Sequence, residues 1–268
     1  MSQQSTTQTH STSLVKALRI LLALADSPDG RGVTNIAQAL DLPKSAVHRL
    51  LVTFQELGFV QKQPKSLYTL GPAVVRLGLQ AADMFAPRLV ARPYLMELAR
   101  VIEETVVLGV LHQGNVLLAD KVDYDHILRV SPVLGSLLPL NQTAMGKLLV
   151  SYCDSYERKS LIDIMLESKE TISKEQQLSK IHKDIEKIIQ QDFFYDMETW
   201  INDIYCFAAP IRNSLDGVVA VVAVMLPTSR LQHLKSCPTS TDESPAFQYP
   251  TIVNALVNTA KRISTSLP

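Results

Sequence analysis

Residues 43–58, PKSAVHRLLVTFQELG, decide the fold of the first part of the chain, because they have the pattern of one amphipathic helix. Pro43 suits the first turn of such a helix, where its missing N–H leaves no partner unsatisfied, and Gly58 is placed to end it. Apolar residues recur at helical spacing and are expected to point inward: Val47, Leu50, Leu51, Phe54 and Leu57. The N-terminal half of the outward face is cationic and polar without an acidic residue; the outward residues are Lys44, Ser45, Ala46, His48, Arg49, Val52 and Thr53.

Two helices are predicted before this one. Ser13 is expected to cap the first, whose apolar face consists of Leu14, Leu18, Leu21, Leu22 and Ala25. It should end before the turn-forming residues Ser27-Pro28-Asp29-Gly30. Thr34 is expected to cap the second, whose inward face is Val33, Ile36, Ala37 and Leu40.

A β-hairpin is predicted after Gly58. Residues 59–63 and 67–70 have strand character on either side of the basic turn Pro64-Lys65-Ser66. This order of helices and hairpin is typical of a winged helix-turn-helix, in which the third helix enters the major groove and the hairpin contacts the DNA backbone. The residues alone leave one alternative open, a protein-interaction module whose basic face is merely solvated.

Residues 14–72 resemble the N-terminal domain of the IclR-type bacterial transcriptional regulators almost throughout. The segments LPKSAVHRLL at 42–51, LGFV at 57–60 and YTLGP at 68–72 carry the resemblance. It implies a double-stranded DNA operator as partner. The expected DNA-binding residues are Thr34, Lys44, Ser45, Ala46, His48, Arg49, Lys62 and Lys65. The family often has Thr or Ser at the position of Ala46, so the base preference of relatives is not expected to carry over there.

The net charge of the chain is zero but unevenly distributed. Residues 1–80 carry eight basic and four acidic residues, a net charge of +4, and the remainder carries 18 basic and 22 acidic residues, −4. A basic first part is expected where only that part meets phosphate. Residues 1–13 are polar and predicted to be a disordered tail without a secretory signal. No apolar run is long enough to span a bilayer, so we expect a cytoplasmic protein without membrane contact.

The second part of the chain is predicted to be an α+β domain at 87–268, joined by a linker helix at 73–86. Arg92-Pro93 is expected to start a helix with Tyr94, Leu95, Leu98 and Ile102 inward. Strands are predicted at 105–111, 116–122, 127–130, 193–198, 205–212 and 218–225, with loops at 132–139 and 236–250. Helices are predicted after Thr143 as far as Tyr152, and at 155–167, 174–191 and 251–266. Runs of strands with helices between them indicate a mainly antiparallel sheet.

This second part resembles, in patches, the IclR-type effector domain, a relative of GAF-like ligand-sensing folds. The matching segments are EET at 103–105, NQTAMGKLL at 141–149, DMETW at 196–200 and CFAAPI at 206–211. The resemblance implies a small carboxylic-acid effector at the helix that follows Thr143, where free backbone N–H groups suit an anion. The expected effector-binding residues are Leu128, Gly135, Ala144, Met145, Asp196, Ile204, Cys206, Ala223 and Met225. Taken without the resemblance, Asp196 reads as a surface acid and Cys206 as a small buried residue.

Two of these residues bear on the choice of effector. Ala223 and Met225 stand where relatives carry serines. An apolar wall at these positions favours an effector with one carboxylate and an apolar body, such as an aromatic acid.

The sequence has no nucleophile–base, phosphate-loop or HExxH signature, and its three cysteines are scattered. We therefore expect a regulator rather than an enzyme, with no metal and no cofactor. The alternative is a ligand-sensing or redox GAF-like protein that uses Cys206, which needs a second thiol nearby. We expect a homo-oligomer, a dimer or tetramer, that presents paired third helices to a pseudo-palindromic site.

Overall fold

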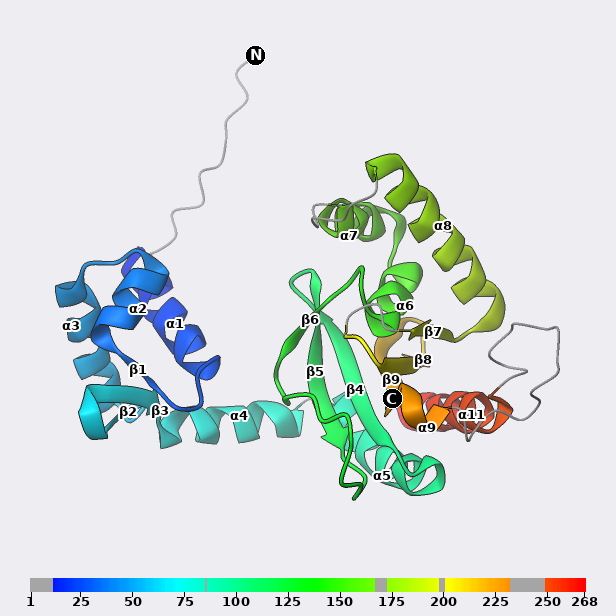
Figure 1. Ribbon diagram of the computed structural model, residues 1–268, viewed down its shortest axis with the longest axis horizontal. Helices are drawn as coiled ribbons and strands as arrows, with labels where there is room; N and C mark the ends of the chain where they lie inside the picture. The colour runs from blue at the N-terminus through cyan, green and yellow to red at the C-terminus, as the bar shows by residue number, and fades with distance from the viewer. Residues whose placement is uncertain (1–11, 85, 167–172, 198–200, 232–248) are drawn as a thin grey trace, which may run out of the picture. The chain divides into compact units, whose positions relative to one another are not determined.

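The computed structural model describes residues 12–84, 86–166, 173–197, 201–231 and 249–268 (Figure 1). The chain divides into two compact units, Met1–Met84 and Phe85–Pro268, called unit 1 and unit 2 below. Most of the predicted tail lies outside the described residues, but Thr12 and Ser13 already belong to the first helix.

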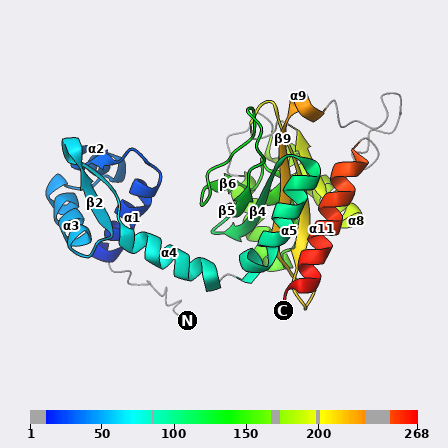
Figure 2. The same ribbon diagram turned by 90° about the horizontal axis from the view of Figure 1, so that it is seen from below.

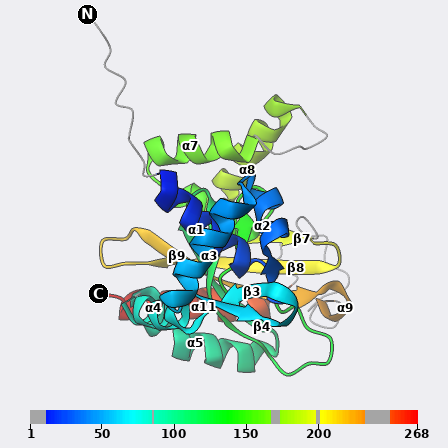
Figure 3. The ribbon, with the colours of Figure 1, turned by 90° about the vertical axis from the view of Figure 1, so that its left-hand side faces the viewer.

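Unit 1 consists of helices around a small sheet. The elements are α1 Thr12–Ala25, β1 Arg31–Gly32, α2 Val33–Leu40, α3 Lys44–Glu56, β2 Val60–Gln63, η1 Pro64–Ser66, β3 Leu67–Leu70 and α4 Pro72–Met84. The hairpin pairs Val60 with Leu70 and Gln63 with Leu67. The short strand β1, which the sequence did not predict, adds to β3, so the strand order is β1-β3-β2. Helices α1, α2 and α3 of unit 1 are the blue ribbons of Figure 3.

The inward face predicted for α1 is wrong except at Leu21, which is half-buried against the core. The buried residues are Ala17, Ile20, Ala23 and Leu24. Leu14, Leu18 and Leu22 are exposed, Leu22 to 66%. Ser13 lies inside the helix and is not its cap. Because α1 is apolar over more than one stripe, its period alone does not say which stripe faces the core, and the packing partners decide.

The starts of α2 and α3 also differ from the prediction. Gly32 is the N-cap of α2, so Thr34 lies within the helix and caps nothing. Pro43 is the N-cap of α3 rather than part of its first turn. Both predictions missed by one or two positions, which is the usual uncertainty of helix ends.

The end of α3 is as predicted. Gly58 has a φ of +75°, which favours glycine. The N–H of Gly58 donates to Gln55 O and that of Phe59 to Phe54 O, the double hydrogen bond of a Schellman motif. The rings of Phe54 and Phe59 pack 6.2 Å apart over it. Leu57, predicted to point inward, is instead 62% exposed.

The hairpin and α4 are joined to this same turn. Gly71 N–H donates to Phe59 O over 2.8 Å, and Ala73 N–H donates to Gly58 O over 3.1 Å. A Cβ on Gly71 would lie 2.3 Å from Gly58 O, so only glycine allows this close approach. The end of α3, the hairpin and the start of α4 therefore meet at one point.

Unit 2 is a six-stranded antiparallel sheet with helices on both faces (Figures 1 and 2). The strand order is β6-β5-β4-β9-β8-β7. The strands are β4 Thr105–His112, β5 Asn115–Val122, β6 Leu137–Pro139, β7 Phe194–Met197, β8 Ile204–Arg212 and β9 Val218–Pro227. Helices α5 Ala86–Ile102 and α11 Pro250–Ser266 pack on one face. Helices α6 Ala144–Tyr152, α7 Ser155–Leu166 and α8 Lys174–Gln191 cover the other, and α9 is Thr228–Leu231.

Most predicted strands of unit 2 are present, and the hairpin of β4 and β5 turns at Gln113-Gly114. Residues 127–130 do not form the predicted strand, and the edge strand β6 lies inside the predicted loop 132–139. Pro93 lies inside α5 rather than at its start, because the burial of Ala91 and Leu95 on either side keeps the helix continuous. Most of the 236–250 loop lies outside the described residues. Within the described ranges, no helix has both the length and the apolar character needed to cross a membrane.

Candidate functional site

The first candidate site is the outer face of α3. Lys44, Ser45, His48 and Arg49 are exposed, and Ala46 is half-buried. The opposite face is anchored by Val47 and Leu51, which are fully buried. Among the described residues, neither Lys44 nor Arg49 takes part in an ion pair. The face therefore presents two cations that no described carboxylate neutralises.

The start of α3 adds uncharged donors to this face. Its N-cap Pro43 has no side chain able to accept a hydrogen bond, and no side chain caps the helix. The first N–H groups of a helix have no intrahelical partner, and together with the helix dipole they attract anions. The start of α3 therefore suits a phosphate of a nucleic-acid backbone.

The hairpin carries the other predicted cations. Lys62 on β2 and Lys65 at the tip are exposed. Lys65 and Ser66 have left-handed φ values of +60° and +58°, so the chain reverses direction within a tight turn at the tip of the hairpin. Thr34 is exposed on α2. All eight predicted DNA-binding residues belong to unit 1, and seven of them are exposed while Ala46 is half-buried.

The second candidate site lies at the start of α6. Thr143 is its N-cap: the hydroxyl accepts from Gly146 N–H over 3.1 Å and donates to Pro139 O over 2.8 Å. The N–H of Ala144, the next donor, is bonded to Asp196 Oδ2 on β7. The N-terminus predicted to bind an effector carboxylate is thus already in contact with a carboxylate of the protein itself.

Asp196 is a buried acid, only 8% exposed, and not a surface residue. Burial raises its pKa from 3.8 to about 6, because desolvation outweighs the lowering effects of the Ala144 hydrogen bond and of Lys147. Lys147 Nζ lies 3.0 Å from Asp184 Oδ2 on α8 and 5.3 Å from the centre of the Phe194 ring. Lys147 therefore forms an ion pair with Asp184 and, at longer range, also attracts the Asp196 carboxylate.

A small cavity adjoins this contact. Its lining residues are Thr143, Met145, Asp196, Ile201, Ile204, Cys206 and Met225. Its empty volume is about 260 Å³, but the part open to water-sized molecules is only about 10 Å³. That is room for about one water molecule, so side chains must move before an organic acid enters.

The sheet register explains how distant residues meet at this cavity. Cys206 on β8 pairs with Asp196 on β7 on one side and with Met225 on β9 on the other. Paired residues of neighbouring strands point to the same face. Met145 and Ile204 complete the set of predicted residues that line the cavity.

Four predicted effector residues do not line the cavity. Ala144 contributes its backbone N–H, and Ala223 is buried two residues along β9 from Met225. Leu128 is 64% exposed, and its carbonyl accepts a hydrogen bond from Arg230. A Cβ added at Gly135 would meet no atom within 4 Å.

Two lining residues were missed. The sequence signal for Thr143 was present, because it stands directly before a predicted helix, as an N-cap does. Ile201 follows β7 in a segment without periodic pattern, so no signal could have found it.

The described cysteines do not suit redox chemistry. Burial, reinforced by Asp196, raises the pKa of the Cys206 thiol well above its usual value. Burial raises the pKa of Cys153 to about 12. Both are free and protonated at neutral pH, and the thiolate is the reactive form. Cys237 lies outside the described residues. The part of the chain that the structure describes contains no group of three His, Cys, Asp or Glu side chains able to hold a metal.

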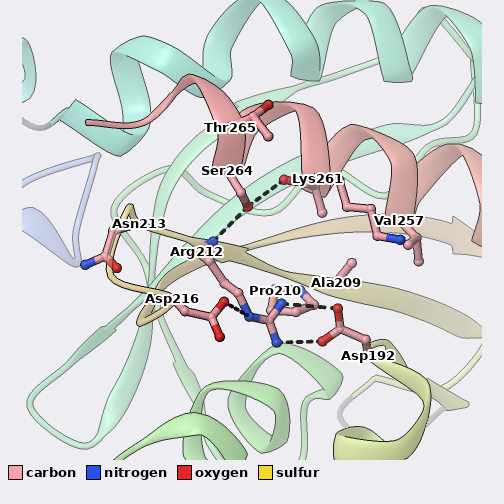
Figure 4. Close-up of a pocket in the computed structure, with 11 residues that line it drawn as sticks. Asp192, Ala209, Pro210, Arg212, Asn213, Asp216, Val257, Lys261, Ser264 and Thr265 are labelled. Atoms are coloured by element: carbon pink, nitrogen blue, oxygen red, sulfur yellow. Dashed lines mark hydrogen bonds and ion pairs between the residues drawn. The ribbon is translucent and has the colours of Figure 1, made fainter.

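A larger cavity, of about 600 Å³, lies between α11 and the turn that joins β8 and β9 (Figure 4). The Arg212 guanidinium bonds both oxygens of Asp192, over 2.7 and 3.1 Å, and its Nε lies 3.3 Å from Asp216. Two carboxylates thus neutralise its cation. None of the predicted effector residues lines this cavity, and we regard the α6 cavity as the better candidate.

Two family models match the chain. The IclR helix-turn-helix domain matches residues 13–64, and the bacterial transcriptional regulator IclR C-terminal domain matches residues 80–241. HTH-type transcriptional regulator KdgR of Escherichia coli is 28% identical over 222 residues, covering 81% of this chain and 83% of that protein. Transcriptional repressor IclR of Escherichia coli is 26% identical over 227 residues, covering 82% and 81%. These relatives are named as regulators and not as enzymes.

Solved structures share the fold. An IclR transcriptional regulator from Alicyclobacillus acidocaldarius superposes with a TM-score of 0.75 at 21% identity, covering 96% of this chain and 98% of that one. An IclR homolog from Microbacterium hydrocarbonoxydans, complexed with 4-hydroxybenzoate, gives 0.75 at 18% identity, with 96% and 99% covered. At these identities the likeness concerns the fold alone.

Proposed function

The chain belongs to the IclR family of DNA-binding bacterial transcriptional regulators, and from this premise we propose that the α6 cavity binds a small carboxylic acid that modulates operator binding by unit 1. The observation that carries the proposal is the contact of Asp196 with Ala144 N–H. It supports the start of α6 as a carboxylate subsite, because a carboxylate already binds there.

The proposed DNA contacts are divided between two regions of unit 1. The outer face of α3, with Lys44 and Arg49, enters the major groove, and the hairpin cations Lys62 and Lys65 contact phosphates. Arg49 is the one arginine on the outer face of α3 and the best placed to read a base edge. DNA contact is confined to unit 1, where the excess of basic residues lies.

The proposed effector has one carboxylate and an apolar body. Met145, Ile201, Ile204 and Met225 make the cavity wall mostly apolar, and such a wall favours a body of matching polarity. The 4-hydroxybenzoate bound by the homolog from Microbacterium hydrocarbonoxydans is an acid of this class. An aromatic acid needs more space than the cavity now offers, so binding displaces side chains, and that displacement is the proposed origin of the signal to unit 1.

The proposed regulator acts in the cytoplasm as a homo-oligomer, a dimer or a tetramer. A two-fold arrangement presents two copies of α3 to successive major grooves of a pseudo-palindromic operator. The effector then changes the spacing of the paired helices rather than the contacts of one helix.

Isothermal titration of the full chain tests the effector proposal. We expect benzoate and 4-hydroxybenzoate to bind more tightly than glyoxylate. In Met225→Ser the preference should shift toward glyoxylate, because a hydroxyl replaces an apolar wall. Tight binding of only the smallest polar acids by the wild type would overturn the proposed apolar class.

A gel shift tests the coupling to DNA. The probe is the DNA upstream of the protein's own gene, at moderate salt, with and without each acid that binds. An acid that binds should change the fraction of shifted DNA. Binding of an acid with no effect on the shift would overturn the proposed modulation.

A further inference from the structure

In the carboxylate subsite of the α6 cavity, a side chain of the protein itself already occupies the position of the effector carboxylate. Asp196 Oδ2 accepts the hydrogen bond of Ala144 N–H, the backbone donor that an effector carboxylate would use. Gly146 N–H, two positions further along α6, is taken by the Thr143 hydroxyl. An incoming carboxylate that uses Ala144 N–H therefore competes with Asp196 for this backbone donor.

Among the residues that the structure describes, the charged groups around Asp196 do not offset a second carboxylate. On α6 the nearest cation is Lys147, which is paired with Asp184 of α8. On β8 the facing group is the Cys206 thiol, which is protonated and neutral. Strand β9 contains no titratable residue. One buried lysine thus already faces two carboxylates.

Two carboxylates that share one buried site do not both remain ionised, because their repulsion is poorly screened away from water. The usual outcome is that the pair holds one proton, which one oxygen donates to the other. Here the protonated partner is the protein's own acid. A neutral Asp196 can release Ala144 N–H, which then donates to the effector carboxylate. The O–H of Asp196 can donate to the same effector carboxylate.

We propose, resting on the proposed function, that the α6 cavity takes up one proton together with each carboxylate effector, with Asp196 as the group that receives it. The effector enters as its anion, the proton comes from solvent, and the complex carries Asp196 in its neutral form. Asp196 thereby makes the regulator's response to a given acid stronger at lower pH.

The raised pKa of Asp196, about 6 in the free protein, determines the pH range in which effector affinity depends on pH. Above pH 6 the free protein holds Asp196 ionised, so each binding event must bring a proton. The dissociation constant then rises up to tenfold for each pH unit. Below pH 6 the residue is already protonated, and affinity becomes nearly independent of pH until the carboxyl of the effector itself is protonated.

Titration calorimetry of the full chain with 4-hydroxybenzoate and benzoate, at pH 6, 7 and 8, tests the inference. Each titration is run in two buffers whose ionisation heats differ, because the difference in observed heat gives the number of protons bound. At pH 8 we expect about one proton for each acid bound, and a dissociation constant about tenfold larger than at pH 7. Asp196→Asn should bind with no proton uptake and a dissociation constant that does not vary with pH.

Asp216→Asn is the matched control. It makes the same substitution at a side chain that is 90% exposed on the turn between β8 and β9, and it should keep the wild-type proton uptake. Tight binding by the wild type with no proton uptake at pH 8 would overturn the inference and leave the proposed function standing. Failure of benzoate, 4-hydroxybenzoate and glyoxylate to bind at pH 6 would overturn the proposed function, and the inference with it.

Discussion

Replacing Asp196 with asparagine should change how the stability of unit 2 depends on pH. Asparagine keeps an oxygen that can accept the hydrogen bond of Ala144 N–H but carries no charge to bury. In the wild type the pKa of this carboxyl is raised from 3.8 to about 6 by burial. The folded protein therefore holds the Asp196 proton more tightly than the unfolded chain does. The wild type should gain stability relative to Asp196→Asn as the pH falls.

The magnitude follows from the two pKa values. At pH 8 the ionised carboxylate costs about 3 kcal/mol of unfolding free energy, and at pH 5 about 1.6 kcal/mol of that cost remains. The difference in unfolding free energy between the wild type and Asp196→Asn should thus change by about 1.4 kcal/mol between these two pH values. Most of the change lies between pH 8 and pH 3.8, where about 0.4 kcal/mol of the cost remains.

Urea unfolding followed by circular dichroism measures this difference at pH 8, 7, 6 and 5, with no acid effector present. Because the chain has two units, the transition of unit 2 is fitted separately from that of unit 1. Asp216→Asn serves as the reference for loss of an exposed carboxylate. A wild-type curve that runs parallel to that of Asp196→Asn, or that falls relative to it in acid, would refute the burial argument.

Three further substitutions test the two sites. Arg49→Ala should weaken operator binding by about 1–3 kcal/mol and leave acid binding intact; a gel shift with unchanged affinity would show that α3 is not the reading helix. Lys65→Ala should weaken binding about equally for all DNA sequences and lower the slope of log affinity against log salt by about one, and a loss confined to one operator sequence would contradict the phosphate contact. Thr143→Ala should destabilise unit 2 by about 1–2 kcal/mol in urea, because it removes the N-cap of α6, whereas Thr143→Ser should recover most of that stability; equal losses in both would point to the methyl group instead.

The sequence predicted α3 well because several independent signals agreed there. Helical spacing, the terminating Gly58 and the hairpin that follows all indicated the same element. The face of α1 failed because Leu14, Leu18 and Leu22 fit a helical stripe as well as the buried residues do. In unit 2 the two-residue turn at Gln113-Gly114 was readable from local signals. The edge strand β6 was not, because its three residues gain their strand conformation only by pairing with β5.

The candidate effector cavity could be predicted only where the family resemblance indicated its residues. Met145 and Cys206 lie in segments that resemble the family, and both line the cavity. Asp196 also lies in such a segment, but its hydrogen bond to Ala144, 52 positions earlier in the chain, could not be predicted from it. Local sequence contains no signal for such a contact. The burial that raises the pKa of Asp196 is likewise a property of the assembled sheet and helices.

The close approach of Gly71 to Gly58 has a consequence for how operator preference can change. The hairpin and the end of α3 are joined by the bonds from Gly71 to Phe59 and from Ala73 to Gly58, so we expect the two DNA-contacting elements to move together. Adjustment of one contact against the other is then not expected at this connection. New operator preferences must therefore arise from exchange of outward side chains such as Ala46, or from the distance between two copies of unit 1. The segments LGFV and YTLGP, which carry part of the family resemblance, are thus the ones that connect α3, the hairpin and α4.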